Sequence, residues 1–197
     1  LFDSGIGGAT VLREVRRRLP AEHLLYLADQ ARCPYGPRSP DELRAIAAAC
    51  ARWLIDHRAK LVVVACNTAS AAALSDLRAR FPATPFVGMV PPVKPAAART
   101  RSRVVGVLAT PATLAGNLLH DVVARWADGV QVVSQPCPGL VEQIEAGALD
   151  TPATDDLLRR YLAPILNAGA DTIVLGCTHY PFLTPRIRAL AGDHVTL

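Results

Sequence analysis

Two cysteines of the sequence stand in matching surroundings. Cys66 follows the apolar run 61–65, and Cys177 follows the largely apolar run 172–176. Each thiol is followed by side chains that form hydrogen bonds, which are Asn67, Thr68, Thr178 and His179. In an open sheet of parallel strands, ligands bind beyond the carboxyl ends of the strands. We therefore expect both thiols to lie in an active site.

Two opposed thiols can act as a paired acid and base. One thiolate removes a proton from carbon while the opposite thiol delivers a proton to the other face, which inverts a stereocentre. An unperturbed thiol, with a pKa of about 8.5, is mostly protonated at neutral pH, so neighbouring groups must tune each one. A helix N-terminus just beyond each cysteine would favour the thiolate. The alternative is a small apolar residue that ends a buried strand, but two matching contexts favour chemistry.

The sequence favours chemistry without a cofactor. A pyridoxal-phosphate racemase needs a Schiff-base lysine. The two lysines are Lys60, which precedes a buried strand, and Lys94, which lies in a proline-rich segment, and neither fits that role. No Cys-x-x-Cys pair occurs, so we also expect no metal site.

A glycine-containing loop, Phe2–Gly8, follows the first expected strand. It only weakly imitates a dinucleotide fingerprint, because Thr10 occupies the third glycine position and Asp3 would place a negative charge beside the pyrophosphate. We expect its backbone N–H groups to bind a small carboxylate, with Asp3 and Ser4 aimed into the site. The structural alternative is that Asp3 only caps the loop.

Strand and helix patterns alternate along the chain, which predicts an α/β fold of parallel sheets with helices on both faces. The expected strands are 23–28, 61–65, 86–90, 103–109, 130–134 and 172–176. The expected helices are 40–57 with a capping box at Ser39, 67–80 capped by Asn67, 110–127, a short one carrying Glu142 and Glu145, and 154–167. The proline-rich segment near Pro91–Pro95 predicts two domains, 1–92 and 93–197.

Composition excludes several classes of protein. Of the 197 residues, 51% are hydrophobic and 19% are charged, which excludes intrinsic disorder. No apolar stretch approaches the roughly 20 residues of a membrane helix. The net charge of +4 comes from scattered arginines, so we expect no nucleic-acid partner. The five cysteines form no disulfide pattern, which favours a reducing cytoplasm, with Cys33, Cys50 and Cys137 used for packing.

The ends of the sequence carry no targeting pattern. No charged segment precedes an apolar one, as a signal peptide requires. The chain opens at Leu1 without an initiator Met and stops within an expected strand at Val195–Leu197. It therefore reads as a fragment trimmed at both ends.

Four motifs together point to a family. They are Phe2–Gly8, Pro34–Gly36, Val64–Ser70 and Leu175–Pro181. In this order they resemble the glutamate racemases of the aspartate/glutamate racemase superfamily, over essentially the whole chain. The resemblance implies cofactor-independent interconversion of L- and D-glutamate, which supplies D-glutamate for peptidoglycan. It also implies two doubly wound α/β domains with the active site in the cleft between them, and a homodimer.

The resemblance also implies roles for individual residues. Cys66 and Cys177 are the expected acid/base thiols, with Asp3, His179 and Glu145 as further catalytic residues. The expected substrate-binding residues are Asp3, Ser4, Tyr35, Gly36, Asn67, Thr68, Thr113, Thr178 and His179. Their hydroxyl, amide and backbone donors suit the two carboxylates of glutamate. For Tyr35 the alternative is a ring that only covers the cleft.

Two departures from the family pattern bear on these assignments. Near Glu145, Gly139 and Glu142 stand where an apolar residue and a proline are expected. The family's C-terminal segment, which completes the first domain, is not among the residues of this sequence.

Two other functions compete with this interpretation. A related isomerase of aspartate, a hydantoin or another small acid would use the same fold and cysteines, and a substrate panel would separate it. The Thr-His-Tyr-Pro string after Cys177 favours glutamate. A non-catalytic protein that binds a small acid would need neither two thiols nor Asp3 and His179.

Overall fold

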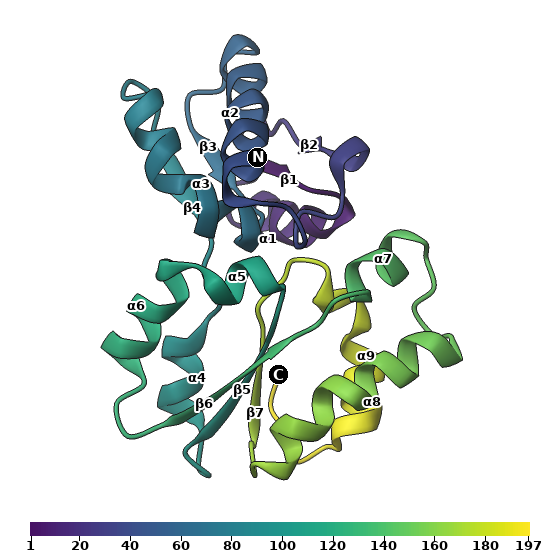
Figure 1. The fold of residues 1–197 in the computed structure, drawn as a ribbon. Helices are drawn as coiled ribbons and strands as arrows, with labels where there is room; N and C mark the ends of the chain where they lie inside the picture. The colour runs from purple at the N-terminus through teal and green to yellow at the C-terminus, as the bar shows by residue number, and fades with distance from the viewer.

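The computed structural model describes all residues, 1–197, and arranges them as two lobes (Figure 1). The first lobe is built on a parallel sheet of order β2-β1-β3-β4, and the second lobe on a parallel sheet of order β6-β5-β7. The strands are β1 (Phe2–Asp3), β2 (Leu27–Ala28), β3 (Val62–Val64), β4 (Phe86–Gly88), β5 (Val104–Ala109), β6 (Gln131–Pro136) and β7 (Thr172–Leu175). The predicted α/β class with parallel sheets is confirmed.

Helices connect the strands in both lobes (Figure 1). The first lobe holds α1 (Ala9–Arg18), α2 (Pro40–Asp56), α3 (Asn67–Arg80) and the 3-10 turns η1 (Ile6–Gly8) and η2 (Gln30–Arg32). The second lobe holds α4 (Val93–Arg99), α5 (Pro111–Ala115), α6 (Asn117–Trp126), α7 (Leu140–Glu145), α8 (Pro152–Asn167), α9 (Thr184–Ala191) and η3 (Tyr180–Leu183). None of these helices has the length and hydropathy to cross a membrane.

The helix boundaries correct two expectations and confirm a third. The capping box at Ser39 is present at the start of α2. Cys66, not Asn67, caps α3, because the cysteine is the last extended residue before the helix. The helix expected over 110–127 is broken at Gly116, whose backbone is extended. A Cβ at Gly116 would lie 2.7 Å from the Cβ of Ala71, so the missing side chain allows this bend to approach α3.

Other expectations failed at the ends of elements. Helices α1, α4 and α9 were not predicted, and five of the six expected strands are shorter in the structure than the runs that predicted them. Residues 195–197 form no strand, and only Thr196 bridges to Thr172. An apolar run marks burial, but a strand ends where its hydrogen-bonding neighbour ends.

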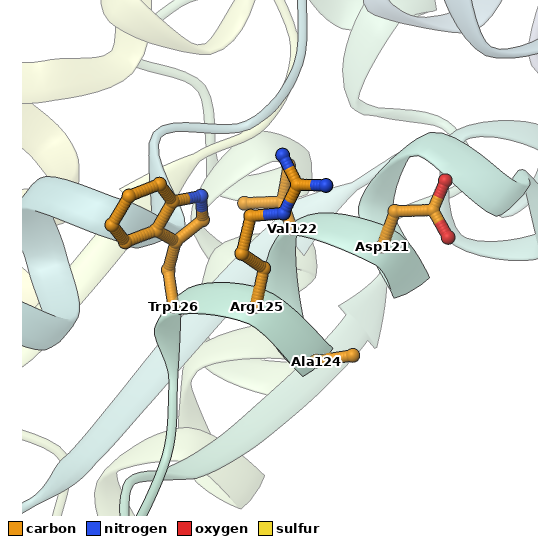
Figure 2. A pocket seen from close by; sticks show the side chains of 5 residues that line it. All are labelled: Asp121, Val122, Ala124, Arg125 and Trp126. Atoms are coloured by element: carbon orange, nitrogen blue, oxygen red, sulfur yellow. The ribbon is translucent and has the colours of Figure 1, made fainter.

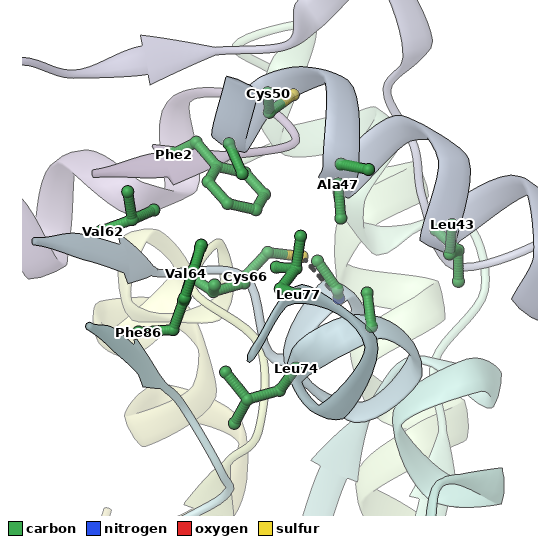
Figure 3. Close-up of a cluster of buried hydrophobic side chains, with 14 of the residues drawn as sticks. Phe2, Leu43, Ala47, Cys50, Val62, Val64, Cys66, Leu74, Leu77 and Phe86 are labelled. Carbon is green, nitrogen blue, oxygen red and sulfur yellow. Dashed lines mark hydrogen bonds between the residues drawn. The ribbon is translucent and has the colours of Figure 1, made fainter. Parts of the chain in front are cut away.

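The first lobe packs its sheet against α2 and α3 (Figure 3). Phe2, Val62 and Val64 point into this core. Val63 points to the opposite face and is half-buried, while its partner Val87 is 46% exposed. The expectation that the run 61–65 is buried on both faces is therefore wrong, because alternate side chains face opposite sides of a strand and only one side has a fully buried core.

The second lobe has a core on each face of its sheet. Leu108 and Ile173 pack with residues of α7, α8 and α9. Val105 and Val107 point the other way and pack with residues of α4 and α6. This arrangement confirms helices on both faces of the second sheet. The last strand of the first sheet ends at Gly88, and α4, which begins at Val93, already packs in the second lobe.

The carboxylate of Asp171 connects two segments of the second lobe at the start of its sheet. Asp171, just before β7, accepts hydrogen bonds from the hydroxyl of Thr100 at 2.6 Å and from the backbone N–H groups of Arg101 and Ser102 at 2.7 and 2.8 Å. Partial burial would raise the pKa of Asp171. These hydrogen bonds and one from Thr172 outweigh it and hold the pKa well below its ordinary value. Asp171 thereby ties the turn before β5 to the start of β7.

We expect the Asp171→Ala substitution to lower the free energy of unfolding by about 2 kcal/mol at pH 7, because it leaves two backbone donors without a charged acceptor. A depressed folded-state pKa stabilises above the unfolded pKa, so the difference from the wild type should shrink as the pH falls below about 4. Urea unfolding of the full-length protein at several pH values measures it. The control is Asp156→Ala, since Asp156 only forms an exposed pair with Arg159. Equal effects of the two substitutions would contradict this role.

Candidate active site

The topology places each cysteine beside a reversal of strand order in its own sheet. In the first sheet β2 and β3 lie on opposite sides of β1, and in the second β6 and β7 lie on opposite sides of β5. Ligands of parallel sheets bind where the strand order reverses in this way. Asp3 and Cys66 lie at the first reversal point, and Thr110 and Cys177 lie at the second. Most of the expected site residues therefore follow two strand ends in each lobe, whereas Glu145 comes from α7 and Tyr35 and Gly36 come from the loop after η2.

Cys66 is buried at the start of α3, on the edge of the first core (Figure 3). Its Sγ accepts a hydrogen bond from the backbone N–H of Ala69 at 3.5 Å. Burial, followed by the charge of Asp3, raises the pKa of this thiol to about 12. The backbone N–H groups of the helix N-terminus act in the expected direction, toward the thiolate, but burial outweighs them.

Cys177 is buried as well, in the loop after β7. Its Sγ lies 3.7 Å from Nδ1 of His179. Burial raises the pKa of Cys177 well above its ordinary value, and a charge on Cys66 raises it again. The two thiols are therefore close enough to influence each other, and a negative charge on one opposes ionisation of the other.

Glu145 lies beside His179, although its surrounding sequence departs from the family pattern. Nε2 of His179 is 2.6 Å from Oε1 of Glu145. A carboxylate only accepts, so Nε2 of His179 donates to Glu145, and Nδ1 is the ring nitrogen that faces Cys177. Partial burial would raise the pKa of Glu145, but hydrogen bonds from His179, the N–H of Ile6 and Gln30 hold it below its ordinary value.

Asp3 links the first lobe to the loop that carries Cys177. It is fully buried and accepts hydrogen bonds from the N–H of Gly5 at 3.2 Å and from Oγ1 of Thr178 at 3.1 Å. Burial raises its pKa, against the opposing effects of nearby His179 and of these hydrogen bonds. Its charge acts on both thiols. Asp3 therefore caps its own loop through Gly5 and also contacts Thr178, the residue after Cys177.

Three buried threonines join the lobes on another side of the site. Oγ1 of Thr68 lies 2.7 Å from Oγ1 of Thr110 and 3.2 Å from Oγ1 of Thr113, and the last two are 2.9 Å apart. Thr68 and Thr113 were expected to bind substrate, whereas Thr110 was not. The Thr110-Pro111 pair directly after a strand, which caps α5, was the signal that could have identified it.

Asn67 has an unused acceptor. Its side chain is buried next to Cys66, and its Oδ1 has no hydrogen-bond partner. Buried polar atoms are nearly always paired, so this oxygen fits a donor that a ligand supplies. Ser4, also buried, follows Asp3 in the same loop.

Tyr35 and Gly36 are placed differently from each other. The Tyr35 ring packs into the first core, and its hydroxyl donates to Asp29 at 2.7 Å. Gly36 lies against Thr110 at the boundary of the lobes and lines a cavity of about 80 Å³. The Tyr35 side chain therefore does not approach the thiols as a ligand contact, and only the backbone of this turn is left for that role.

Another hollow of the surface lies away from the thiols. It measures about 610 Å³ and is lined along α6 by Asp121, Val122, Ala124, Arg125 and Trp126 (Figure 2). It contains no thiol and no residue at a strand end, so it is not a candidate for this chemistry.

Comparison with known proteins agrees with this geometry. Residues 7–196 match the family model of the Asp/Glu/Hydantoin racemases. Over 193 residues the chain is 81% identical to a glutamate racemase of Roseiflexus sp. (strain RS-1), an alignment that covers 98% of this chain and 71% of that protein.

Solved structures give the same result. The glutamate racemase of Escherichia coli, in complex with L-glutamate and the activator UDP-MurNAc-ala, matches with a TM-score of 0.89 and 37% identity over 100% of this chain and 75% of that one. The glutamate racemase of Francisella tularensis, in complex with D-glutamate, matches with a TM-score of 0.86 and 33% identity over 100% and 73% of the two chains. The chain therefore belongs to the Asp/Glu/Hydantoin racemase family.

Proposed function

We propose that the protein is a glutamate racemase that interconverts L- and D-glutamate with Cys66 and Cys177 as its acid/base pair. The observation that carries this proposal is the placement of two buried thiols at facing strand ends, in a chain 81% identical to a glutamate racemase. The high identity favours glutamate over aspartate or another small acid as substrate. Rates with glutamate and aspartate, measured side by side in D₂O, test the choice.

In the proposed reaction, one proton is removed from the α-carbon and another is added to its opposite face. One cysteine, as the thiolate, takes the α-proton, so the C–H bond breaks and an S–H bond forms. The electron pair is delocalised into the α-carboxylate, and the opposite thiol then gives its proton to the other face of the carbon. The thiol that gave its proton becomes the thiolate, and the reverse reaction exchanges the roles.

His179 and Asp3 are proposed to manage the protons of the two thiols. Nδ1 of His179 faces Cys177 and can accept its proton, while Glu145 holds the ring in the necessary tautomer. Asp3, with a raised pKa and an effect on both thiols, is the group proposed to take a proton from Cys66. Both thiols have raised pKa values, so they need such acceptors.

The polar groups around the thiols match the substrate. The unpartnered Oδ1 of Asn67 fits the ammonium group, which is the cationic donor of glutamate. The hydroxyls of Ser4, Thr68, Thr110 and Thr113 are proposed to turn toward the two carboxylates, whereas the hydroxyl of Thr178 already donates to Asp3. Backbone N–H groups at Tyr35 and Gly36 are proposed to add to them.

The placement of the lysines supports a reaction without pyridoxal phosphate. Lys60 pairs with Glu22 at 2.7 Å, and both side chains are exposed. Lys94 lies over the ring of Trp126. We propose that the reaction uses neither this cofactor nor a metal.

The cellular setting is proposed from chemistry and from the resemblance. All five cysteines are free, and a catalytic thiol must stay reduced, which supports the cytoplasm. D-Glutamate is a building block of peptidoglycan, so the product would enter cell-wall synthesis. The resemblance to glutamate racemases supports a homodimer.

We expect Cys66→Ala and Cys177→Ala each to lower racemisation roughly a thousandfold or more, because inversion needs both an acid and a base. Circular dichroism of L- or D-glutamate in the full-length protein follows the reaction. The controls are Cys50→Ala and Cys137→Ala, since both cysteines pack within the cores. Near-wild-type activity in either of the first two variants would exclude the two-thiol mechanism.

We expect Asn67→Ala to raise the KM for both enantiomers about tenfold with a smaller change in kcat, because it removes an acceptor for the ammonium group. Steady-state kinetics in both directions measure the split. Asn117→Ala is the matched control, since Asn117 is the exposed first residue of α6. An unchanged KM would show that Asn67 does not bind the substrate.

We expect Asp3→Asn and His179→Asn to change the two directions unequally. The equilibrium constant between enantiomers is one, so kcat/KM falls equally in both directions, and asymmetry is confined to kcat, KM and isotope effects. If each group serves its own thiol, the α-deuterium isotope effects on the L-to-D and D-to-L reactions should shift in opposite senses in the two variants, by about 1.5-fold. Symmetric isotope effects in both, with activity within about twofold of wild type, would refute these roles.

A further inference from the structure

A third cysteine completes a set of metal-ligand atoms next to the catalytic groups. Cys33 follows η2 in the first lobe, while Glu145 and His179 come from the second. The thiol sulfur, a carboxylate oxygen and a ring nitrogen of these three residues all lie within 4.8 Å of one another. The mechanism uses Glu145 and His179 but has no use for Cys33.

We propose that Cys33, Glu145 and His179 bind a zinc ion that inhibits the enzyme. Sulfur, nitrogen and oxygen donors together are the set that zinc accepts, whereas magnesium and calcium require oxygen ligands alone. Three protein ligands leave a fourth position to water. The inhibition rests on the proposed function, but the binding of zinc does not.

The geometry needs only small movements to hold the ion. Ligand atoms of tetrahedral zinc lie about 3.3 to 3.6 Å apart, given zinc–ligand distances of roughly 2.0 to 2.3 Å. The group already fits within 4.8 Å. The 2.6 Å hydrogen bond between His179 and Glu145 must open by somewhat less than 1 Å, so that the ion replaces the shared proton.

The charges around Cys33 favour a cation. The carboxylates of Glu145, Asp3 and Glu142 lie close enough to act on its thiol. Their negative charges attract a divalent ion, and zinc binding displaces the thiol proton into solution. The guanidinium of the adjacent Arg32 is paired with Asp29 at 2.7 Å, so its charge is already compensated.

The position of the ion explains why it would inhibit. Zinc would bind Nε2 of His179 in place of the proton shared with Glu145, and the neutral ring would then carry its proton on Nδ1, where it could no longer accept the proton of Cys177. It would also join Cys33 of the first lobe to two residues of the second, which would hold the lobes closed over the site. Cys33 is half-buried and therefore easier to reach than the buried Cys66 and Cys177.

Binding is tested with Co²⁺ as a spectroscopic substitute for zinc, on the reduced, metal-free full-length protein. We expect one ion per chain, a thiolate-to-cobalt charge-transfer band, and loss of that band when Zn²⁺ is added. Cys33→Ala should lose the band, whereas Cys50→Ala, a cysteine of the first core, should keep it. No stoichiometric binding, binding without the band, or an unchanged band in Cys33→Ala would each overturn the site. None of these results depends on racemisation.

Inhibition is tested in the same three proteins. We expect Cys33→Ala to racemise glutamate at the wild-type rate and to need at least about tenfold more Zn²⁺ for half inhibition. Cys50→Ala should be as sensitive as the wild type, and a chelator should restore activity. Equal zinc sensitivity in Cys33→Ala would show that the ion acts through the catalytic thiols instead, and would overturn the proposal. Should the protein not racemise glutamate, the cobalt spectra still decide the site.

Discussion

The burial of two thiols within range of each other is the constraint on which the rest of the site depends. Removal from water raises both pKa values, and a charge on Cys66 raises the pKa of Cys177 further. A second negative charge in the pair is therefore opposed, which suits a reaction in which one thiol is the acid while the other is the base. In the proposed mechanism, Asp3, His179 and the N-terminus of α3 set which thiol carries the charge.

The glycine loop after β1 follows from the same requirement for closeness. Side chains of the second lobe occupy the space where side chains at Gly5 and Gly7 would lie, with Glu145 against the first and His179 against the second. The N–H of Ile6, between these glycines, donates to Glu145 at 2.8 Å. The loop thus packs directly against Glu145 and His179 of the other lobe. This close contact, rather than nucleotide binding, explains its glycines.

The features that could be predicted from the sequence are those that depend on residues close together in the chain. The two cysteines and their polar neighbours stand at strand ends, so periodicity and topology rules were enough to place them. The sheets followed from the alternation of elements, although pairing, not hydropathy, decided where each strand ended. Glu145 needed the resemblance, because its partner His179 is far away in the sequence. Thr110 was missed because its contact with Thr68 joins two lobes, although its place before Pro111 was a local signal. The inward turn of Tyr35 depended on packing in the first core and on a hydrogen bond to Asp29, which the turn-rich sequence does not indicate.

The buried threonines form a closed ring. Each of Thr68, Thr110 and Thr113 lies within 3.2 Å of the other two, and every hydroxyl can donate to one neighbour and accept from the other. Such a ring has two directional orders, clockwise and anticlockwise, that differ only in the positions of hydrogen atoms. A carboxylate that accepts from one of these hydroxyls would open the ring at that O–H, and the two remaining hydrogen bonds would still join the three threonines.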